Sequence, residues 1–335
     1  MLVLLASCDH NVTMLTDVHA DGSIDKTIVV EVKDSAGSNM LGIGPATGWE
    51  TKIEKLTAKN RKRESDMDYQ VQLRKHFPTV AAANAELATP SDTLFRVSST
   101  FEKKFRWFYT YLYYADTYQA LNRMNYPIED FVTPEDYHFI DRLAAEGKPI
   151  ARADSLYLET LNYKLFNIYW MHAYFEEYYA AMRELIRKNR IGDQWLDSLR
   201  VHKQELLEKL MDDNNREMEL AFVLRVVNSR LGIPWPAGAH EQLEILMKPA
   251  ERMSKFMSDA HAGKYQHAVN MPWDVIETNA DSVAGRSLFW SPPPMRFLIK
   301  DYTLYAEARQ MNYWAVALSV AVIGFSLYLF WRRRN

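Results

Sequence analysis

The sequence predicts an α+β protein: a mostly antiparallel β-domain, an inserted helical bundle, and one transmembrane helix on the C-terminal side. Apolar and polar residues alternate in the first third of the chain and again near its end, which is the period of strands. The middle of the chain repeats apolar residues at helical spacing instead. We therefore expect residues 9–115 and 263–310 to form one discontinuous β-rich domain around a helical insertion at 116–262. Two serial domains are the alternative.

Composition excludes some classes of protein. Hydrophobic residues make up 48% of the chain and charged residues 25%, which is ordinary for a globular protein. The formal net charge is only −3, and the one basic run, at residues 59–63, is short, so we expect no nucleic-acid partner. The single cysteine, Cys8, excludes an internal disulfide and a cysteine metal cluster.

The first β-rich segment begins with a hairpin signal. Asp21-Gly22 separates two β-branched runs, at residues 11–20 and 24–33, and this dipeptide favours the tight turn of a hairpin. A short alanine-rich helix with proline at its first turn is expected at 78–88. Further strands are expected at 49–56, 67–77, 93–101 and 105–115.

The last of these strands is unusually aromatic. Trp107, Tyr109, Tyr111 and Tyr113 alternate, so they would share one face, and the opposite face is also apolar. A strand that is apolar on both faces is typical of the centre of a sheet. The four residues are the candidate ligand-lining residues, because apolar pockets carry such side chains. Packing of the sheet against helices is the alternative, and we favour it.

The helical insertion has clear start and stop signals. Thr133 and Pro134 are suited to the cap and first position of a helix, and Gly232 with Pro234 ends another. Helices are expected at 153–188, 193–212, 216–231 and 240–261. They would form an antiparallel bundle.

Strands return after the helices, and a membrane segment follows them. Extended structure is expected at 265–278, 286–290 and 297–308. Residues 313–331 carry no charge and would span roughly 28 Å as a helix, close to the thickness of the bilayer core. Arg332, Arg333 and Arg334 follow, so the positive-inside rule predicts a cytoplasmic C-terminal end and an extracytoplasmic body. A buried core helix is the alternative, and the three arginines argue against it.

The N-terminal residues suggest a second anchor. Leu5-Ala6-Ser7-Cys8 resembles the lipobox of bacterial lipoproteins, in which the cysteine takes a diacylglycerol and the preceding signal segment is cleaved. Residues 1–8 would then be the end of a signal, and we expect the true start upstream because basic residues are missing and the apolar stretch is short. An incidental cysteine is the alternative. Lipid on Cys8 and a helix at 313–331 would both place the body on the periplasmic side of the bacterial cytoplasmic membrane.

Two stretches resemble the LppM-like group of bacterial envelope lipoproteins. The first is Cys8 followed by the Asp21-Gly22-Ser23 hairpin, and the second is Pro272, Val275-Ile276, Thr278-Asn279 and later Trp290. The resemblance covers under half of the chain. It implies one small α/β domain before a membrane helix, with a lipid or another apolar molecule as a possible ligand. The helical insertion has no counterpart in it.

The sequence contains no strong catalytic motif. There is no His-Glu-x-x-His, no glycine-rich phosphate loop and no Gly-x-Ser-x-Gly, so we expect no catalytic residue, cofactor or metal. Glu135-x-x-His138 is the nearest metal-like spacing, and a single copy is more typical of a surface pair. His172 and Glu176, one helical turn apart, would suit proton transfer, although a hydrogen-bonded core network is the favoured interpretation.

Three functions follow, in order of preference. The first is a membrane-anchored binding or assembly module of the bacterial envelope, without catalysis, whose helical insertion contacts a protein partner. The second is a lipoprotein domain that holds a lipid ligand. The third is an envelope enzyme that uses His172 and Glu176.

Overall fold

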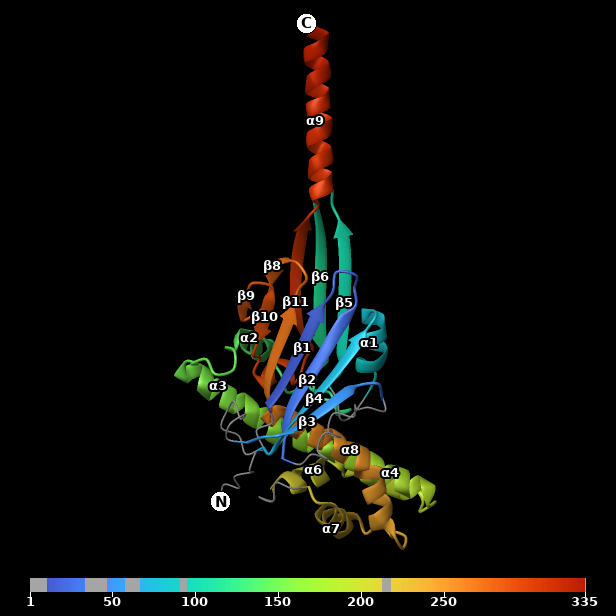
Figure 1. Cartoon of the computed structure of the whole chain (residues 1–335). Coiled ribbons are helices and arrows are strands. Elements are labelled where there is room, and N and C mark those ends of the chain that lie inside the picture. Colours follow the sequence, from blue (N-terminus) through green and yellow to red (C-terminus); the bar gives the residue numbers. More distant parts are fainter. Residues whose placement is uncertain (1–10, 34–46, 58–66, 91–94, 213–217, 335) are drawn as a thin grey trace. The chain divides into compact units, whose positions relative to one another are not determined.

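The computed structural model describes residues 11–33, 47–57, 67–90, 95–212 and 218–334, so Cys8 and residues 1–10 lie outside the described residues. The chain divides into two compact units. The β-unit comprises residues 1–121 and 261–335, and the helical unit comprises residues 122–260. The expected fold class is confirmed: the protein is α+β with mostly antiparallel sheets, a helical region, and one apolar C-terminal helix (Figure 1).

The first sheet of the β-unit has seven strands in the order β3-β4-β2-β1-β7-β10-β9. Its hairpin of β1 and β2 turns at Asp21-Gly22, as the sequence predicts, and Gly22 takes the positive φ (96°) that glycine tolerates best. Strand β1 pairs in parallel with β7, which joins the early and late parts of the chain. The bounds are β1 Asn11–Val18, β2 Ile24–Val32, β3 Glu50–Lys55, β4 Tyr69–Phe77, β7 Lys264–Asn270, β9 Ser282–Ala284 and β10 Ser287–Trp290, with helix α1 at Val80–Leu87.

The second sheet has four strands in the order β5-β6-β11-β8, so the aromatic strand β6 is central, as its two apolar faces predict. The predicted bounds of β5 and β6 are wrong by about four residues. Pairing with β11 fixes the register of β6, and local alternation cannot reveal a distant partner. Trp107 therefore lies in the turn between the strands. The bounds are β5 Val97–Phe105, β6 Tyr109–Tyr118, β8 Asp274–Thr278 and β11 Tyr302–Met311, with a 3₁₀ turn η4 at Pro294–Phe297.

A buried ion pair joins the two sheets. Lys26 Nζ on β2 lies 2.8 Å from Asp116 Oδ2 on β6, and both side chains are almost fully buried. The lysine also donates to the hydroxyl of Thr16, and the hydroxyls of Ser99 and Tyr114 donate to Asp116. Although burial alone would raise the pKa of Asp116, the charge and hydrogen bonds of Lys26 lower it, so the carboxylate stays ionised. A polar centre thus lies between the two sheets, within an otherwise apolar core.

The helical unit is built from helices with local capping signals. A capping box at Thr133 starts α2, and Gly232 at φ 64° ends α7. The predicted helix at 153–188 contains a π-helical segment, η3, which propensity does not reveal. The bounds are α2 Pro134–Arg142, α3 Arg152–Tyr163, η3 Lys164–Tyr169, α4 Trp170–Lys188, α5 Asp193–Val201, α6 Lys203–Asp212, α7 Leu220–Leu231 and α8 Ala239–Ala262.

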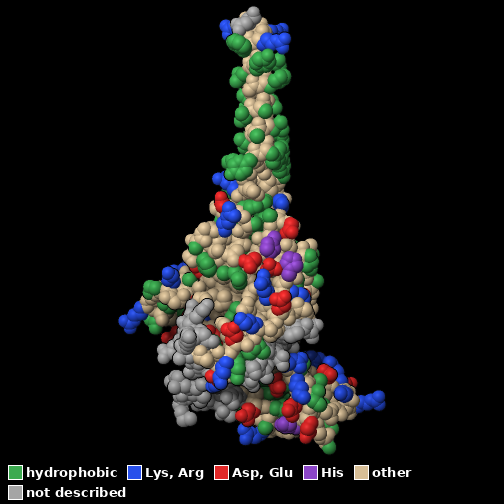
Figure 2. Space-filling model, viewed as in Figure 1, with side chains coloured by type: hydrophobic (Ala, Val, Ile, Leu, Met, Phe, Trp, Pro, Cys, Tyr) green, Lys and Arg blue, Asp and Glu red, His purple; other side chains and the backbone are tan. Residues whose placement is uncertain are grey.

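Helix α9 (Tyr313–Arg334) is long and apolar enough to cross a membrane, by length and composition. It leaves the end of β11 after one residue, Asn312 (Figure 1). Figure 2 shows hydrophobic side chains along this helix and basic side chains at its far end, which are Arg332, Arg333 and Arg334. The side chains of α9 are almost all exposed, so the helix is not the core of the β-unit.

Candidate binding groove

Three of the four candidate ligand-lining residues, Tyr109, Tyr111 and Tyr113, lie on the outer face of β6 in the second sheet. Tyr111 and Tyr113 border an open surface depression together with Glu102, Lys104 and Glu307, and Tyr113 stacks on Tyr305 with ring centres 6.2 Å apart. Tyr109 is half-buried on the same strand. Trp107 lies in the turn and contacts α9 instead. The structure thus brings Tyr111 and Tyr113 together at the surface and leaves Trp107 apart.

The space between the two sheets is small. The cavity lined by Met14, Thr16, Lys26, Phe95 and Tyr118, among others, measures about 20 Å³. That volume holds about one water molecule. An acyl chain does not fit there, so this part of the β-unit offers a lipid no interior site.

The residues of the possible proton-transfer pair are engaged with other groups. His172 is half-buried against the rings of Tyr126 and Phe131, with centres 6.1 and 5.2 Å away. Burial lowers the pKa of His172, and the charge of Glu176 only partly offsets that effect. Glu176 Oε1 lies 2.6 Å from Lys203 Nζ. The carboxylate therefore pairs with a lysine. Glu135 and His138 are exposed on α2.

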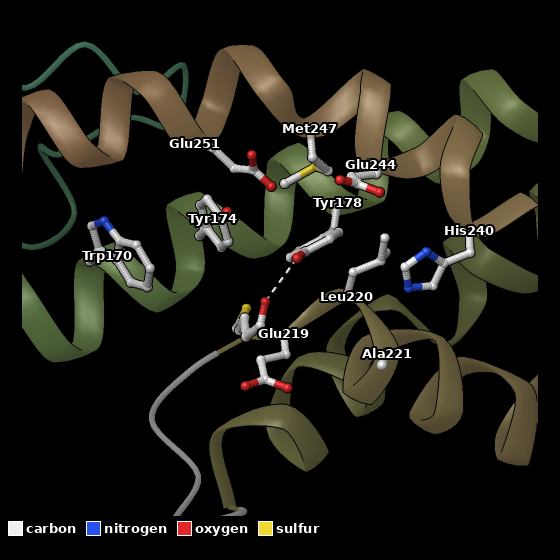
Figure 3. A pocket seen from close by; sticks show the side chains of 11 residues that line it. Trp170, Tyr174, Tyr178, Glu219, Leu220, Ala221, His240, Glu244, Met247 and Glu251 are labelled. Carbon is white, nitrogen blue, oxygen red and sulfur yellow. Dashed lines mark hydrogen bonds between the residues drawn. The ribbon is translucent and has the colours of Figure 1, made fainter.

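The helical unit contains a groove of about 520 Å³ that the sequence did not reveal (Figure 3). Three elements form it: helix α4, the start of α7 with the two residues before it, and helix α8. Side chains at i, i+4 and i+8 lie along one side of a helix, so α4 contributes a row of three aromatic rings. The lining residues are Trp170, Tyr174, Tyr178, Met218, Glu219, Leu220, Ala221, His240, Glu244, Met247 and Glu251.

The aromatic row forms a continuous surface. The rings of Trp170 and Tyr174 are stacked, with centres 4.7 Å apart, and Tyr174 meets Tyr178 edge to face at 5.3 Å. The hydroxyl of Tyr178 donates to the carbonyl of Met218 at 2.8 Å, which ties the residues before α7 to α4. Burial, with a smaller effect of the Glu251 charge, raises the pKa of Tyr174 to about 12. The Tyr174 hydroxyl is therefore neutral at physiological pH.

Acidic side chains border the aromatic row. Glu219, Glu244 and Glu251 line the groove and are exposed, and the described lining contains neither lysine nor arginine. Aromatic faces attract cations, and carboxylates add charge attraction. The apolar side chains of Leu220 and Met247 complete the lining. The groove therefore has the chemistry to bind a positively charged, amphipathic segment.

The comparisons with known proteins identify no family. No family model matches the chain, and no curated protein matches it. Among solved structures, the folded domain of LppM from Mycobacterium tuberculosis, determined by NMR, aligns over 93% of this chain and 96% of that chain. The sequence identity is 8% and the TM-score is 0.30. This neighbour carries the name of the group that the sequence resembles.

Proposed function

We propose that this protein is a membrane-anchored, extracytoplasmic binding or assembly module of the bacterial envelope. Its helical unit binds a positively charged, amphipathic segment of a partner protein in the groove between α4, α7 and α8. The observation that carries this proposal is the row of Trp170, Tyr174 and Tyr178 bordered by acidic side chains. Catalysis is not part of the proposal.

The anchor is α9. A helix of this length and hydropathy can span a bilayer, and the arginines at its end favour the cytoplasmic side. The β-unit and the helical unit would then lie in the periplasm or its equivalent. A lipid on Cys8, at the lipobox-like segment, would add a second attachment to the same membrane.

A protein partner suits the groove better than a lipid does. The groove is open and carries three carboxylates, which repel the phosphate of a lipid headgroup. The cavity between the two sheets measures about 20 Å³, which is too small for an acyl chain. Basic side chains stacked on aromatic rings contribute roughly 0.5–2 kcal/mol each, so a segment with two or three of them gains useful affinity.

The proposal is tested with a defined probe, a fluorescein-labelled amphipathic peptide of lysine and leucine. Its binding to the full chain in nanodiscs of zwitterionic lipid is measured by fluorescence anisotropy. Replacing Glu219, Glu244 and Glu251 together by glutamine should weaken binding about tenfold, because exposed charge pairs contribute roughly 0.2–1 kcal/mol each. Added salt should weaken binding to the unaltered chain more than binding to this variant.

A matched control separates the groove from overall charge. The triple variant Glu146→Gln, Glu159→Gln, Glu184→Gln removes the same number of exposed carboxylates from the helical unit outside the groove. It should bind the peptide as the unaltered chain does. Equal weakening in both triple variants would show that the peptide responds to net charge alone and would overturn the proposal.

A further inference from the structure

The turn between β5 and β6 exposes a run of aromatic residues beside α9. Within this segment, which we name the hairpin tip (residues 105–109), Phe105 is 57% exposed and Trp107 and Phe108 are each 47% exposed. It is unusual for several large aromatic side chains in one short turn to be exposed to water. Arg106 is exposed between them.

The hairpin tip is fixed to the first turns of α9. The Trp107 indole Nε1 donates to Ser319 Oγ at 2.8 Å, and the ring of Phe105 stacks on Trp314 with centres 6.0 Å apart. The side chain of Asn312 donates to the carbonyl of Arg106 at 2.8 Å, and its backbone N–H donates to the carbonyl of Phe108 at 2.8 Å. The tip and the helix start therefore form one rigid piece.

These contacts set the depth of the hairpin tip. Ser319 comes six residues after Tyr313, which places it roughly 9 Å along the axis of α9. Tyr313 and Trp314 are the kind of residues that mark the bilayer interface. If α9 crosses a membrane, the hydrogen bond to Ser319 places the Trp107 indole on the acyl-chain side of the interface that Tyr313 and Trp314 mark. The guanidinium of Arg309 lies 4.8 Å from the Tyr109 ring centre. Arg309 and Arg106 are then positioned to bind lipid phosphates.

We propose that the hairpin tip is a second membrane contact, in which Phe105, Trp107 and Phe108 enter the interface of the bilayer that α9 spans. The inference rests on the membrane anchoring in the proposed function. Burying these rings would prevent the β-unit from tilting about a single helix. The hairpin tip and α9 would therefore attach the β-unit to the membrane together.

The test uses three positions of equal exposure in the same unit. Phe108, Ile53 on β3 and Leu318 on α9 are each 47% exposed. In a Cys8→Ser background, Phe108→Cys, Ile53→Cys and Leu318→Cys each receive an environment-sensitive NBD label. The labelled full chains are placed in nanodiscs with and without doxyl-labelled phosphatidylcholine.

The expected result is quenching of the labels at 108 and 318 by the doxyl lipid, and no quenching at 53. If the label at 318 is quenched and the label at 108 behaves like the one at 53, the hairpin inference is wrong while the anchor stands. No quenching at 318 would overturn both. Phe105→Cys repeats the measurement at a second place in the tip, in case Phe108→Cys disturbs the turn.

A separate cluster on the β-unit has the composition of a metal site. His19 Nε2 lies 3.1 Å from Asp25 Oδ2, and His76 Nδ1 lies 2.7 Å from Asp25 Oδ1. One ligand atom from each residue lies within 4.8 Å of the other two. Figure 2 shows histidine and acidic side chains gathered on one face of the β-unit. The sequence predicts no metal, because these residues come from two distant segments.

The backbone holds this cluster in place. Asp25 on β2 and His76 on β4 are directly paired in the strand register, and His19 lies in the β1–β2 turn, where its N–H donates to the carbonyl of Ser23. Asp25 is mostly buried, and the two histidines are about half exposed in an open depression of about 450 Å³.

The geometry points to a binding site for a divalent transition metal such as Zn²⁺, held by His19, Asp25 and His76 with open positions for water. Two imidazole nitrogens and one carboxylate are a donor set that zinc accepts, whereas Mg²⁺ prefers oxygen alone. Arg74 Nη2 lies 3.8 Å from Asp25 Oδ2 and competes for the carboxylate. The affinity should therefore be moderate.

Isothermal titration of the untagged full chain, with Cys8→Ser, measures the binding of ZnCl₂. We expect one site that weakens at least tenfold in His76→Gln and in His19→Gln and that stays unchanged in His138→Gln, an exposed histidine on α2. MgCl₂ should show no binding at this site. Zinc binding that is absent, or that is the same in all variants, would overturn the proposal.

Discussion

The ion pair of Lys26 and Asp116 gives the sharpest prediction about stability. Replacing Asp116 by asparagine keeps the shape of the side chain but leaves the ammonium of Lys26 buried without its counter-charge. Breaking a buried pair in this way costs about 3–5 kcal/mol, because the remaining charge is neither solvated nor paired. The β-unit should lose that much stability.

The expected magnitude can be read as a rate of hydrogen exchange. Each 1.4 kcal/mol changes an opening equilibrium by a factor of about ten, so a loss of 3 kcal/mol or more speeds exchange roughly 150-fold or more. The assay is hydrogen–deuterium exchange of the full chain in nanodiscs, read by mass spectrometry on peptides from β2 and β6. Peptides of the helical unit provide an internal reference.

Two further variants complete the experiment. Lys26→Met together with Asp116→Leu removes both charges and should recover most of the lost protection. Glu54→Gln removes an exposed partner of Lys52 on β3 and should change exchange by less than tenfold. If Asp116→Asn exchanges as slowly as the unaltered chain, a buried Lys26 without its counter-charge costs no stability and the reasoning is refuted.

Three other predictions concern single substitutions with smaller expected effects on stability. Burial lowers the pKa of His267 to about 4, so folding favours the neutral imidazole. The β-unit should therefore lose stability as pH falls from about 6.5 to 4. His267→Gln should flatten that part of a plot of unfolding free energy against pH. Thr133→Ala removes the cap of α2 and should lower the stability of the helical unit by about 1 kcal/mol in thermal unfolding. Tyr178→Phe releases the carbonyl of Met218 and should speed hydrogen exchange at the start of α7, without changing exchange in α5.

Much of the fold could be predicted where local chemistry determines it. Asp21-Gly22 sets the first hairpin, Thr133 and Pro134 start α2, and the uncharged stretch after Tyr313 gives α9. The parallel pairing of β1 with β7 and the register of β6 on β11 depend on residues far away in the chain. The bounds of β5 and β6 were wrong for that reason. The π-helical segment before Trp170 carries no signal in propensity.

The candidate sites were harder to predict than the fold. The helical spacing of Trp170, Tyr174 and Tyr178 is visible in the sequence, but by itself it indicates only a buried stripe on one helix. The groove forms because α7 and α8 lie alongside α4, which the spacing does not reveal. Asp25 and His76 are 51 residues apart and meet only because β2 pairs with β4 in one register. A site assembled across elements in this way has no motif in the sequence.

The central claim is that the groove of the helical unit binds a protein partner, and photo-crosslinking in the native envelope tests it most directly. A photoreactive phenylalanine replaces Ala221, exposed in the groove, or Val201, which is 69% exposed on α5, in the full-length chain. We predict a discrete crosslinked product from position 221 alone, lost when Glu219, Glu244 and Glu251 become glutamine. The same products from both positions, or a product at 221 that persists without the three carboxylates, would contradict the account.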